Sequence, residues 1–378
     1  MKKNFLTTEF FLASSTTEGF FSVFKDLYNP DEDWFCYILK GGPGTGKSTI
    51  MKKINLKAIE NGIKSELIHC SSDPDSLDAI ILPELKIAVT DGTAPHILEP
   101  IYPGVSDSII NLGEAWNKKL LYKSKDKIHE LCSKNSLYHK MSKRYLKAFG
   151  CAFSEYSKII NASVDYNSLN AYCERLTKKL FKKTKSNHEF SYEQKRLISA
   201  ITPKGYTFFD NTLFNMSEKL FIIEDSFGLI GSYIIKKIKN YTLDKNYHII
   251  TCNSPFFPSE NLNALFIPDL KIGFAVKNSK EISEIPKNFI SKKITTKRFL
   301  SPEKISSQKN LLKFNKKFCK EMYKESVTNL KKALEIHNQI EKIYIKSMNY
   351  SKINKITDKL ISAIFKNTLY NFNSEILN

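Results

Sequence analysis

A glycine-rich stretch that ends in lysine and serine is the part of this sequence with the clearest chemical meaning. Residues 41–48 read Gly-Gly-Pro-Gly-Thr-Gly-Lys-Ser and fit the pattern G-x-x-x-x-G-K-[ST]. Glycines let successive backbone N–H groups curl around a phosphate, while the lysine reaches the β- and γ-phosphates of a nucleotide and the serine hydroxyl ligands Mg²⁺. The pattern therefore predicts a nucleotide site that consists of Gly41, Gly42, Pro43, Gly44, Thr45, Gly46, Lys47, Ser48 and Thr49.

The segments on either side of these glycines are of the type that positions such a loop. Residues 35–39 are an apolar run typical of a buried strand, and apolar residues recur at helical spacing through residues 48–61. A helix that begins there directs the positive end of its dipole at the phosphate. The alternative is a glycine-rich turn without a ligand, but it does not require this order of strand, loop and helix. We therefore expect phosphate binding.

A candidate metal ligand lies at the end of a later strand. Residues 65–70 and 86–91 are interpreted as the second and third strands, and the third ends in Asp91. An apolar strand that ends in aspartate is the form expected of the Walker B element, which holds Mg²⁺. The alternative is that Asp91 only opens the turn before Gly92. Ser48 and Asp91 are therefore the predicted metal ligands.

Three carboxylates lie between these strands, in residues 71–78. They follow the carboxyl end of a strand, where open α/β sheets bind their ligands. Asp73, Asp75 or Asp78 could orient an attacking water or accept a proton from a hydroxyl substrate. The alternative is a helix cap at Asp75 or Ser76. Lys47, Asp91, Asp73 and Asp78 are our catalytic candidates.

Two histidines lie near the expected site. His96, a further catalytic candidate, follows the third strand, and His69 ends the second strand, although a lone loop histidine is more often structural. No histidine or cysteine pair has the spacing of a zinc site. Because Gly92 follows Asp91, the glutamate that AAA+ and RecA-like ATPases carry there is missing. A kinase-like core or a divergent ATPase remains.

The composition indicates a large cytoplasmic protein with about two domains. The chain has 378 residues, of which 42% are apolar, and its seven cysteines occur singly. No apolar run is long enough for a membrane helix, and we do not expect a signal peptide. The net charge of +19 could serve an acidic partner such as nucleic acid. Only four of the 58 basic residues are arginines, so a lysine-coated surface is the alternative.

The chain repeats itself with a period of roughly 185 residues. Residues 50–54 recur as 234–238, and residues 83–87 as 268–272. We therefore expect a tandem duplication of an α/β domain, in which a parallel sheet is flanked by helices and followed by a helical tail. The predicted domains are 1–185 and 186–378, with tails at about 114–184 and 307–370.

The second copy lacks the residues that would bind phosphate. Gly231 stands in the position of Lys47, Ile230 in that of Gly46, and Val276 in that of Asp91. Without the lysine, nothing neutralises the charge of a γ-phosphate. We therefore expect the second copy to be a non-catalytic partner that packs on the first.

The residues 40–49, 69–78, 83–85 and 91–96 together resemble a poorly characterised Firmicutes family of tandem P-loop NTPases. The resemblance implies ATP binding and a cytoplasmic location. In that family the second copy often retains a recognisable P-loop, and this chain departs from the pattern. The leading prediction is Mg-dependent ATP binding and hydrolysis by the first domain. A P-loop small-molecule kinase and a nucleic-acid-associated ATPase are the alternatives.

Overall fold

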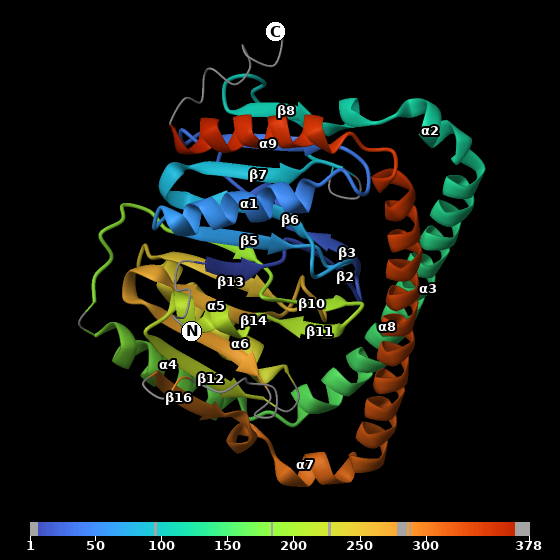
Figure 1. The fold of residues 1–378 in the computed structure, drawn as a ribbon. Coiled ribbons are helices and arrows are strands. Elements are labelled where there is room, and N and C mark those ends of the chain that lie inside the picture. Colours follow the sequence, from blue (N-terminus) through green and yellow to red (C-terminus); the bar gives the residue numbers. More distant parts are fainter. Residues whose placement is uncertain are drawn as a thin grey trace. The chain divides into compact units, whose positions relative to one another are not determined.

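The computed structural model describes residues 7–93, 97–182, 184–225, 228–277, 286 and 289–366. The chain divides into two compact units that are assembled from interleaved segments. Unit 1 comprises residues 1–12, 24–141 and 329–378, and unit 2 comprises residues 13–23 and 142–328. Each unit contains a six-stranded sheet with helices packed against it (Figure 1). The predicted α/β class is therefore confirmed.

The sheet of unit 1 has the strand order β1-β5-β6-β7-β4-β8. Its strands are β1 (Thr7–Phe10), β4 (Phe35–Lys40), β5 (Ser65–His69), β6 (Leu77–Leu82), β7 (Ile87–Asp91) and β8 (Asp107–Asn111). Within this sheet β6 runs antiparallel to both neighbours, and the other pairs are parallel. The prediction of a parallel sheet is therefore wrong in this respect. The connections on both sides of β6 are too short for the helical crossover that parallel strands need.

The helices of unit 1 come from distant parts of the sequence. They are α1 (Lys47–Glu60), α2 (Lys118–Lys123), α9 (Tyr350–Phe365) and parts of α3 (Lys125–Ala162) and α8 (Lys309–Ile345), with the short η1 (Phe24–Asp26), η2 (Pro83–Leu85) and η3 (Leu112–Ala115). Ile54 of α1 and Leu360 of α9 are both fully buried in one core with Val89 of the sheet. The helix from the end of the chain therefore completes the core of the first sheet.

Unit 2 repeats this arrangement. Its sheet has the order β9-β13-β14-β15-β12-β16, and β14 is the strand that runs antiparallel to its neighbours. The elements are β9 (Tyr192–Arg196), β12 (Lys219–Glu224), β13 (His248–Asn253), β14 (Leu262–Ile267), β15 (Ile272–Lys277), β16 (Ile290–Thr295), α4 (Tyr166–Phe181), α5 (Asp210–Met216), α6 (Ile230–Leu243), α7 (Pro302–Ser307), η4 (Pro268–Leu270) and η5 (Thr296–Phe299). Two hairpins, β2 (Ala13–Thr16) with β3 (Gly19–Ser22) and β10 (Ser199–Thr202) with β11 (Gly205–Phe208), also belong to this unit.

The helical tails exchange their last helices between the units. In unit 2, α4 buries Leu169 and Cys173 in the core of the second sheet, and a backbone bridge joins Val164 to Leu300. In unit 1, the matching bridge joins Trp116 to Met348 at the start of α9. The units therefore do not coincide with the predicted domains 1–185 and 186–378. The helical pattern of each tail is confirmed, but the pattern does not determine which sheet its last helix covers.

The long helices α3 and α8 pack side by side (Figure 1). In unit 1, the Asn135 side chain donates to the carbonyl of Ala333 at 2.8 Å. In unit 2, the hydroxyls of Ser142 and Ser326 lie 2.8 Å apart. Within the described part of the chain, no helix is both long enough and apolar enough to cross a bilayer.

Candidate functional site

The glycine-rich loop, residues 41–46, connects β4 to α1. The predicted strand and helix are confirmed, since β4 ends at Lys40 and α1 begins at Lys47. Gly44 and Gly46 have φ angles of 69° and 86°, in the left-handed region that residues with a Cβ rarely adopt. The glycines therefore allow the chain to turn sharply into α1, whose first N–H groups remain without helical acceptors.

Thr45 fixes the interior of the glycine-rich loop. Its side chain is buried, and its hydroxyl donates to the Gly42 carbonyl at 2.9 Å. A Cβ on Gly41 would lie only 2.8 Å from the Thr45 hydroxyl oxygen. Only glycine therefore fits at position 41 without a shift of its neighbours.

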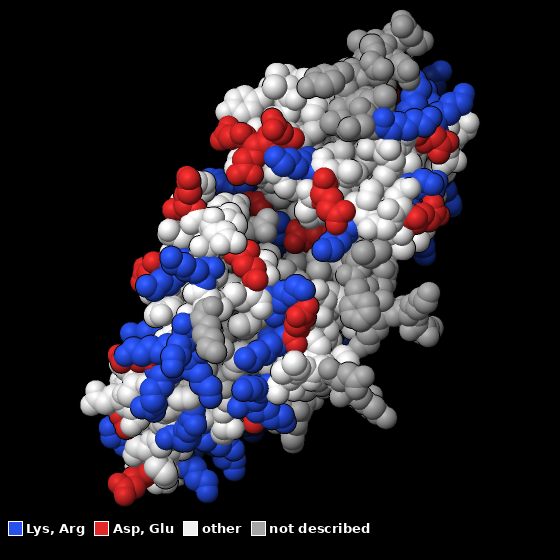
Figure 2. Space-filling model, turned by 90° about the vertical axis from the view of Figure 1, so that its left-hand side faces the viewer, with Lys and Arg blue, Asp and Glu red and all other residues white. Residues whose placement is uncertain are grey.

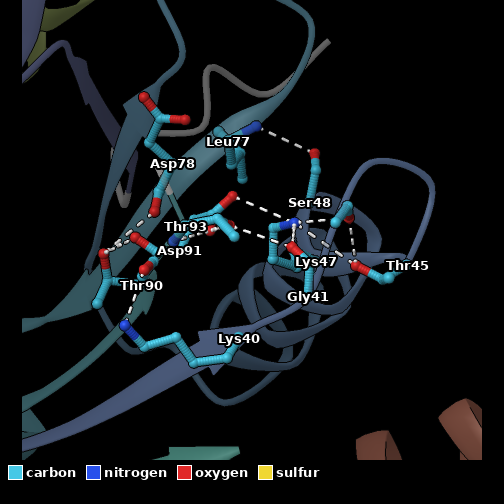
Figure 3. Close-up of polar contacts among 12 residues, drawn as sticks. Lys40, Gly41, Thr45, Lys47, Ser48, Leu77, Asp78, Thr90, Asp91 and Thr93 are labelled. Atoms are coloured by element: carbon cyan, nitrogen blue, oxygen red, sulfur yellow. Dashed lines mark hydrogen bonds and ion pairs between the residues drawn. The ribbon is translucent and has the colours of Figure 1, made fainter. Parts of the chain in front are cut away.

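Lys47 folds back over the glycine-rich loop (Figure 3). Its ammonium nitrogen donates to the carbonyls of Gly41 at 2.5 Å and Gly42 at 2.9 Å, and it lies 3.4 Å from Oδ2 of Asp91. These contacts bring Lys47 and Asp91, two predicted site residues, to one point at the start of α1. The side chain of Lys47 is largely shielded from solvent, with 12% of its area exposed.

Asp91 has two different contacts at the end of β7. Its Oδ1 accepts from the backbone N–H of Thr93 at 2.8 Å and from the Thr93 hydroxyl, whereas Oδ2 faces Lys47. The Thr93 hydroxyl also lies 3.1 Å from the Gly41 carbonyl (Figure 3). The carboxylate therefore closes the turn after β7, as the alternative interpretation expects, and it also faces Lys47. The role of Asp91 as a metal ligand stays a prediction.

Ser48 joins the first turn of α1 to the start of β6. Its hydroxyl oxygen accepts from the backbone N–H of Leu77 at 3.0 Å, which leaves its lone pairs partly available. Thr49, the last residue of the predicted nucleotide site, is exposed. The Ser48 hydroxyl and the Asp91 carboxylate are oxygen donors of the kind that Mg²⁺ prefers, and Mg²⁺ sites use few protein ligands besides phosphates. The described residues contain no group of three or more His, Cys, Asp or Glu that could hold a metal.

Asp78 is the buried acid of the site. In the pairing of β5 with β6, Ile68 lies opposite Ala79 and His69 opposite Leu77, so Asp78 is an extra residue in a bulge. Burial, followed by the negative charge of Asp91, raises the pKa of Asp78 to about 7. An acid with this pKa is partly ionised at neutral pH and can both accept and release a proton.

Cys70 and His69 also affect the charge of Asp78. Burial raises the pKa of the Cys70 thiol well above its usual value, and the hydrogen bond between this thiol and Asp78 lowers the pKa of the carboxyl. The nearby His69 lowers it as well. His69 itself faces the carbonyl of Pro74 at 2.8 Å and Oε1 of Glu9 at 3.1 Å. The histidine therefore supports the acidic loop structurally.

The other acids of this loop have local roles. Asp73 accepts from the Ser76 hydroxyl at 2.5 Å and closes the turn before β6. Asp75 is exposed, and its backbone carbonyl accepts from Lys52. The alternative of a helix cap here is wrong, because the buried strand β6 follows. His96 lies outside the described residues.

Trp116 and residues from the last part of the chain also lie against the glycine-rich loop. A Cβ on Gly42 would lie 3.2 Å from the Trp116 ring and 3.5 Å from Tyr344 of α8. The Tyr350 hydroxyl of α9 donates to the Gly44 carbonyl at 3.0 Å. These residues were not predicted from the sequence. No local signal could have revealed them, because all three lie far from the glycine-rich loop in the sequence.

The corresponding loop of unit 2 contains its own anion. Oδ2 of the buried Asp225 accepts from the backbone N–H of Gly231 at 2.7 Å, in the first turn of α6. A Cβ on Gly231 would lie 2.8 Å from Val276. The space that a lysine would need is therefore filled, and a carboxylate already uses an N–H group of the helix start.

The arginines all lie in unit 2. Arg144, Arg175, Arg196 and Arg298 fall within its residue range. Arg196 is fully buried in β9, and the Arg298 guanidinium lies 4.2 Å from the centre of the Tyr172 ring. Within unit 1, the cation that contacts the glycine-rich loop is a lysine, Lys47.

Comparisons of this chain with protein-family models, with curated proteins and with solved structures find no match.

Proposed function

We propose that this protein is an ATPase with one nucleotide site, formed by the glycine-rich loop of unit 1. The observation that carries the proposal is the position of the Lys47 ammonium, which lies between the Gly41 and Gly42 carbonyls and the Asp91 carboxylate. These oxygens hold a cation at the start of α1, where a helix favours an anion. A polyphosphate can replace the carbonyls as the partner of Lys47.

Each residue of the site has a defined task in this proposal. Backbone N–H groups of the glycine-rich loop bind the phosphates, and Lys47 neutralises the charge that develops on the transferred phosphoryl group. Mg²⁺, when bound, would neutralise further phosphate charge, and Ser48 and Asp91 are the residues that would hold it. Asp78 would accept a proton from the attacking water, since its pKa of about 7 suits a general base.

The second copy is proposed to be a non-catalytic duplicate. The same order of strands in the two sheets, each with its single reversed strand at the same place, supports an origin by duplication. The contact between Asp225 and Gly231 supports the loss of phosphate binding, because a fixed carboxylate repels a phosphate. We therefore expect one ATP per chain.

Release of ADP by the full chain tests this function. Turnover with Mg-ATP alone is the expected result. Turnover that requires an added hydroxyl compound would instead identify a kinase, because Asp78 would then act on an acceptor hydroxyl. Lys57→Ala, at an exposed position on α1, is a control that should retain turnover. Absence of both ATP binding and turnover in the wild-type protein would contradict the proposal.

A further inference from the structure

The positive charge of the chain is concentrated in unit 2. Its residue range contains 33 Lys and Arg against 18 Asp and Glu, a net charge of +15, whereas unit 1 has 25 against 21, a net charge of +4. A genome-wide preference for lysine codons would affect both units equally. The difference therefore requires a local cause.

Helix α4 carries a continuous stripe of cations. Arg175, Lys178 and Lys179 of α4 and Lys182, its C-cap, are all exposed. They follow the spacing i, i+3, i+4, i+7, which places them on one side of the helix. The opposite side is buried in the core of unit 2. In α9, the counterpart in unit 1, the matching positions are Lys359, Ser362, Ala363 and Lys366. The stripe is therefore not a consequence of the repeated architecture.

Neighbouring elements extend this stripe on both sides. The exposed Lys237 of α6 lies close enough to α4 for its charge to lower the pKa of the Cys173 thiol. On the other side, Arg298 of η5 is exposed and lies over the ring of Tyr172. Figure 2 shows Lys and Arg gathered in the lower part of that view, where Figure 1 places α4 and β16. We call this surface the basic face. It consists of Arg175, Lys178, Lys179, Lys182, Lys237 and Arg298.

We propose that the basic face binds the phosphate backbone of a nucleic acid. A surface rich in cations gains affinity from each phosphate that it neutralises, through the release of condensed counterions. Most of these cations lie on α4, α6 and η5 rather than in loops, so less backbone freedom is lost on binding. Backbone contacts of this kind do not read sequence, and the interaction is therefore non-specific.

The surface fits a nucleic acid better than a membrane. Helices that bind bilayers insert large apolar side chains beside their cations. Among the described residues of α4, α6 and η5, Tyr166 is the one large hydrophobic residue that is exposed. The aromatic rings on this face instead contact cations, as Tyr172 does with Arg298 and Tyr233 with Lys237.

Binding of labelled duplex DNA and duplex RNA of equal length to the full chain, measured at several salt concentrations, tests this proposal. The wild-type protein should bind with an affinity that falls steeply with salt. The variant Arg175→Gln/Lys178→Gln/Lys182→Gln should bind about tenfold more weakly, and the slope of log K against log salt should fall by about 2 to 3. The two duplexes show whether the backbone is DNA or RNA.

A matched variant shows whether binding depends on the basic face or only on the net charge of the protein. Lys313→Gln/Lys316→Gln/Lys320→Gln removes three exposed cations from α8 in the same unit, and it should keep affinity within about twofold of wild type. Melting followed by circular dichroism verifies that both variants fold. If the α4 triple variant unfolds, the single change Lys178→Gln should still lower the slope by about 1.

Three results would overturn the proposal. The first is equal weakening by the two triple variants, because net charge would then explain binding. The second is absence of nucleic acid binding by the wild-type protein at a physiological salt concentration. The third is binding to phosphatidylserine vesicles without binding to either duplex. None of these results bears on ATP binding by unit 1.

Discussion

The ammonium nitrogen of Lys47 lies 3.4 Å from Oδ2 of Asp91, which brings the start of α1 and the end of β7 to one point. The lysine also donates to the Gly41 carbonyl. An ion pair with this much shielding from solvent constrains both side chains, and it holds the ammonium at the start of α1. In the ATPase that we propose, the ion pair between Lys47 and Asp91 breaks when the ammonium of Lys47 binds the polyphosphate.

Asp78→Asn should lower ATP turnover by about 100- to 10,000-fold, because an amide cannot accept a proton from water. Wild-type turnover should rise with pH and reach half of its maximum near the pKa of Asp78, about 7. The pH profile of kcat measures both effects. Asp73→Asn is the control, since Asp73 closes a turn. Equal losses in both variants would contradict the role of Asp78.

Asp78 should also make the stability of the fold depend on pH. Its pKa is raised from 3.8 in the unfolded chain to about 7 in the folded protein, so between these values the folded state holds one more proton. The free energy of unfolding should therefore fall as pH rises through this window, by about 1.4 kcal/mol per pH unit. Urea unfolding of wild type and Asp78→Asn should show this slope in the wild type only.

Gly44→Ala should destabilise unit 1 and weaken ATP binding. The φ angle of Gly44 is 69°, and its added Cβ would lie 2.9 Å from Ile345 and 3.1 Å from the Glu341 carbonyl of α8. We expect a loss of about 1–3 kcal/mol in the free energy of unfolding. Gly62→Ala is a matched control, because Gly62 has a φ angle of 71° and no atom within 4 Å of its Cβ. If both variants lose the same free energy of unfolding, the contact of the added Cβ with α8 has no effect on stability.

Much of the fold could be predicted from local pattern. The apolar run at residues 35–39 predicted the strand that is β4 in the structure. The helical spacing of Ile50 and Ile54 predicted the helix that is α1. Strand β6 was missed because its apolar run, residues 77–82, begins inside an acidic segment that resembles a loop. The exchange of α4 and α9 could not be predicted, because an apolar helix face fits either of two similar sheets.

The part of the site that is formed by residues close together in the sequence could be predicted. The glycine-rich loop needs only residues 41–48, so its pattern places Lys47 and Ser48 without further information. The role of Asp78 could not be predicted from its neighbours in the sequence alone. Its burial and its electrostatic interaction with Asp91 depend on the reversed strand β6. No local rule could predict the role of Tyr350, because Tyr350 and Gly44, which it contacts, are far apart in the sequence.

The two halves of the sequence should not fold separately. Residues 1–185 lack α9, which buries Leu360 and Ile364 in the core of unit 1. The isolated fragments 1–185 and 186–378 should therefore show no cooperative thermal unfolding, and mixing them should restore it. The full chain cut at an inserted protease site near residue 186 is the control and should stay folded. A cooperative transition in fragment 1–185 alone would contradict the exchange.

Calorimetric titration of the full chain with Mg-ATP, compared with Lys47→Ala, tests the central claim most directly. The wild-type protein should bind one ATP per chain, and Lys47→Ala should weaken binding by about 10- to 100-fold, the value of hydrogen bonds from one charged group. Lys57→Ala, on the same helix, should bind like the wild type. Unchanged affinity in Lys47→Ala, or two equal sites in the wild type, would contradict a single site in the glycine-rich loop.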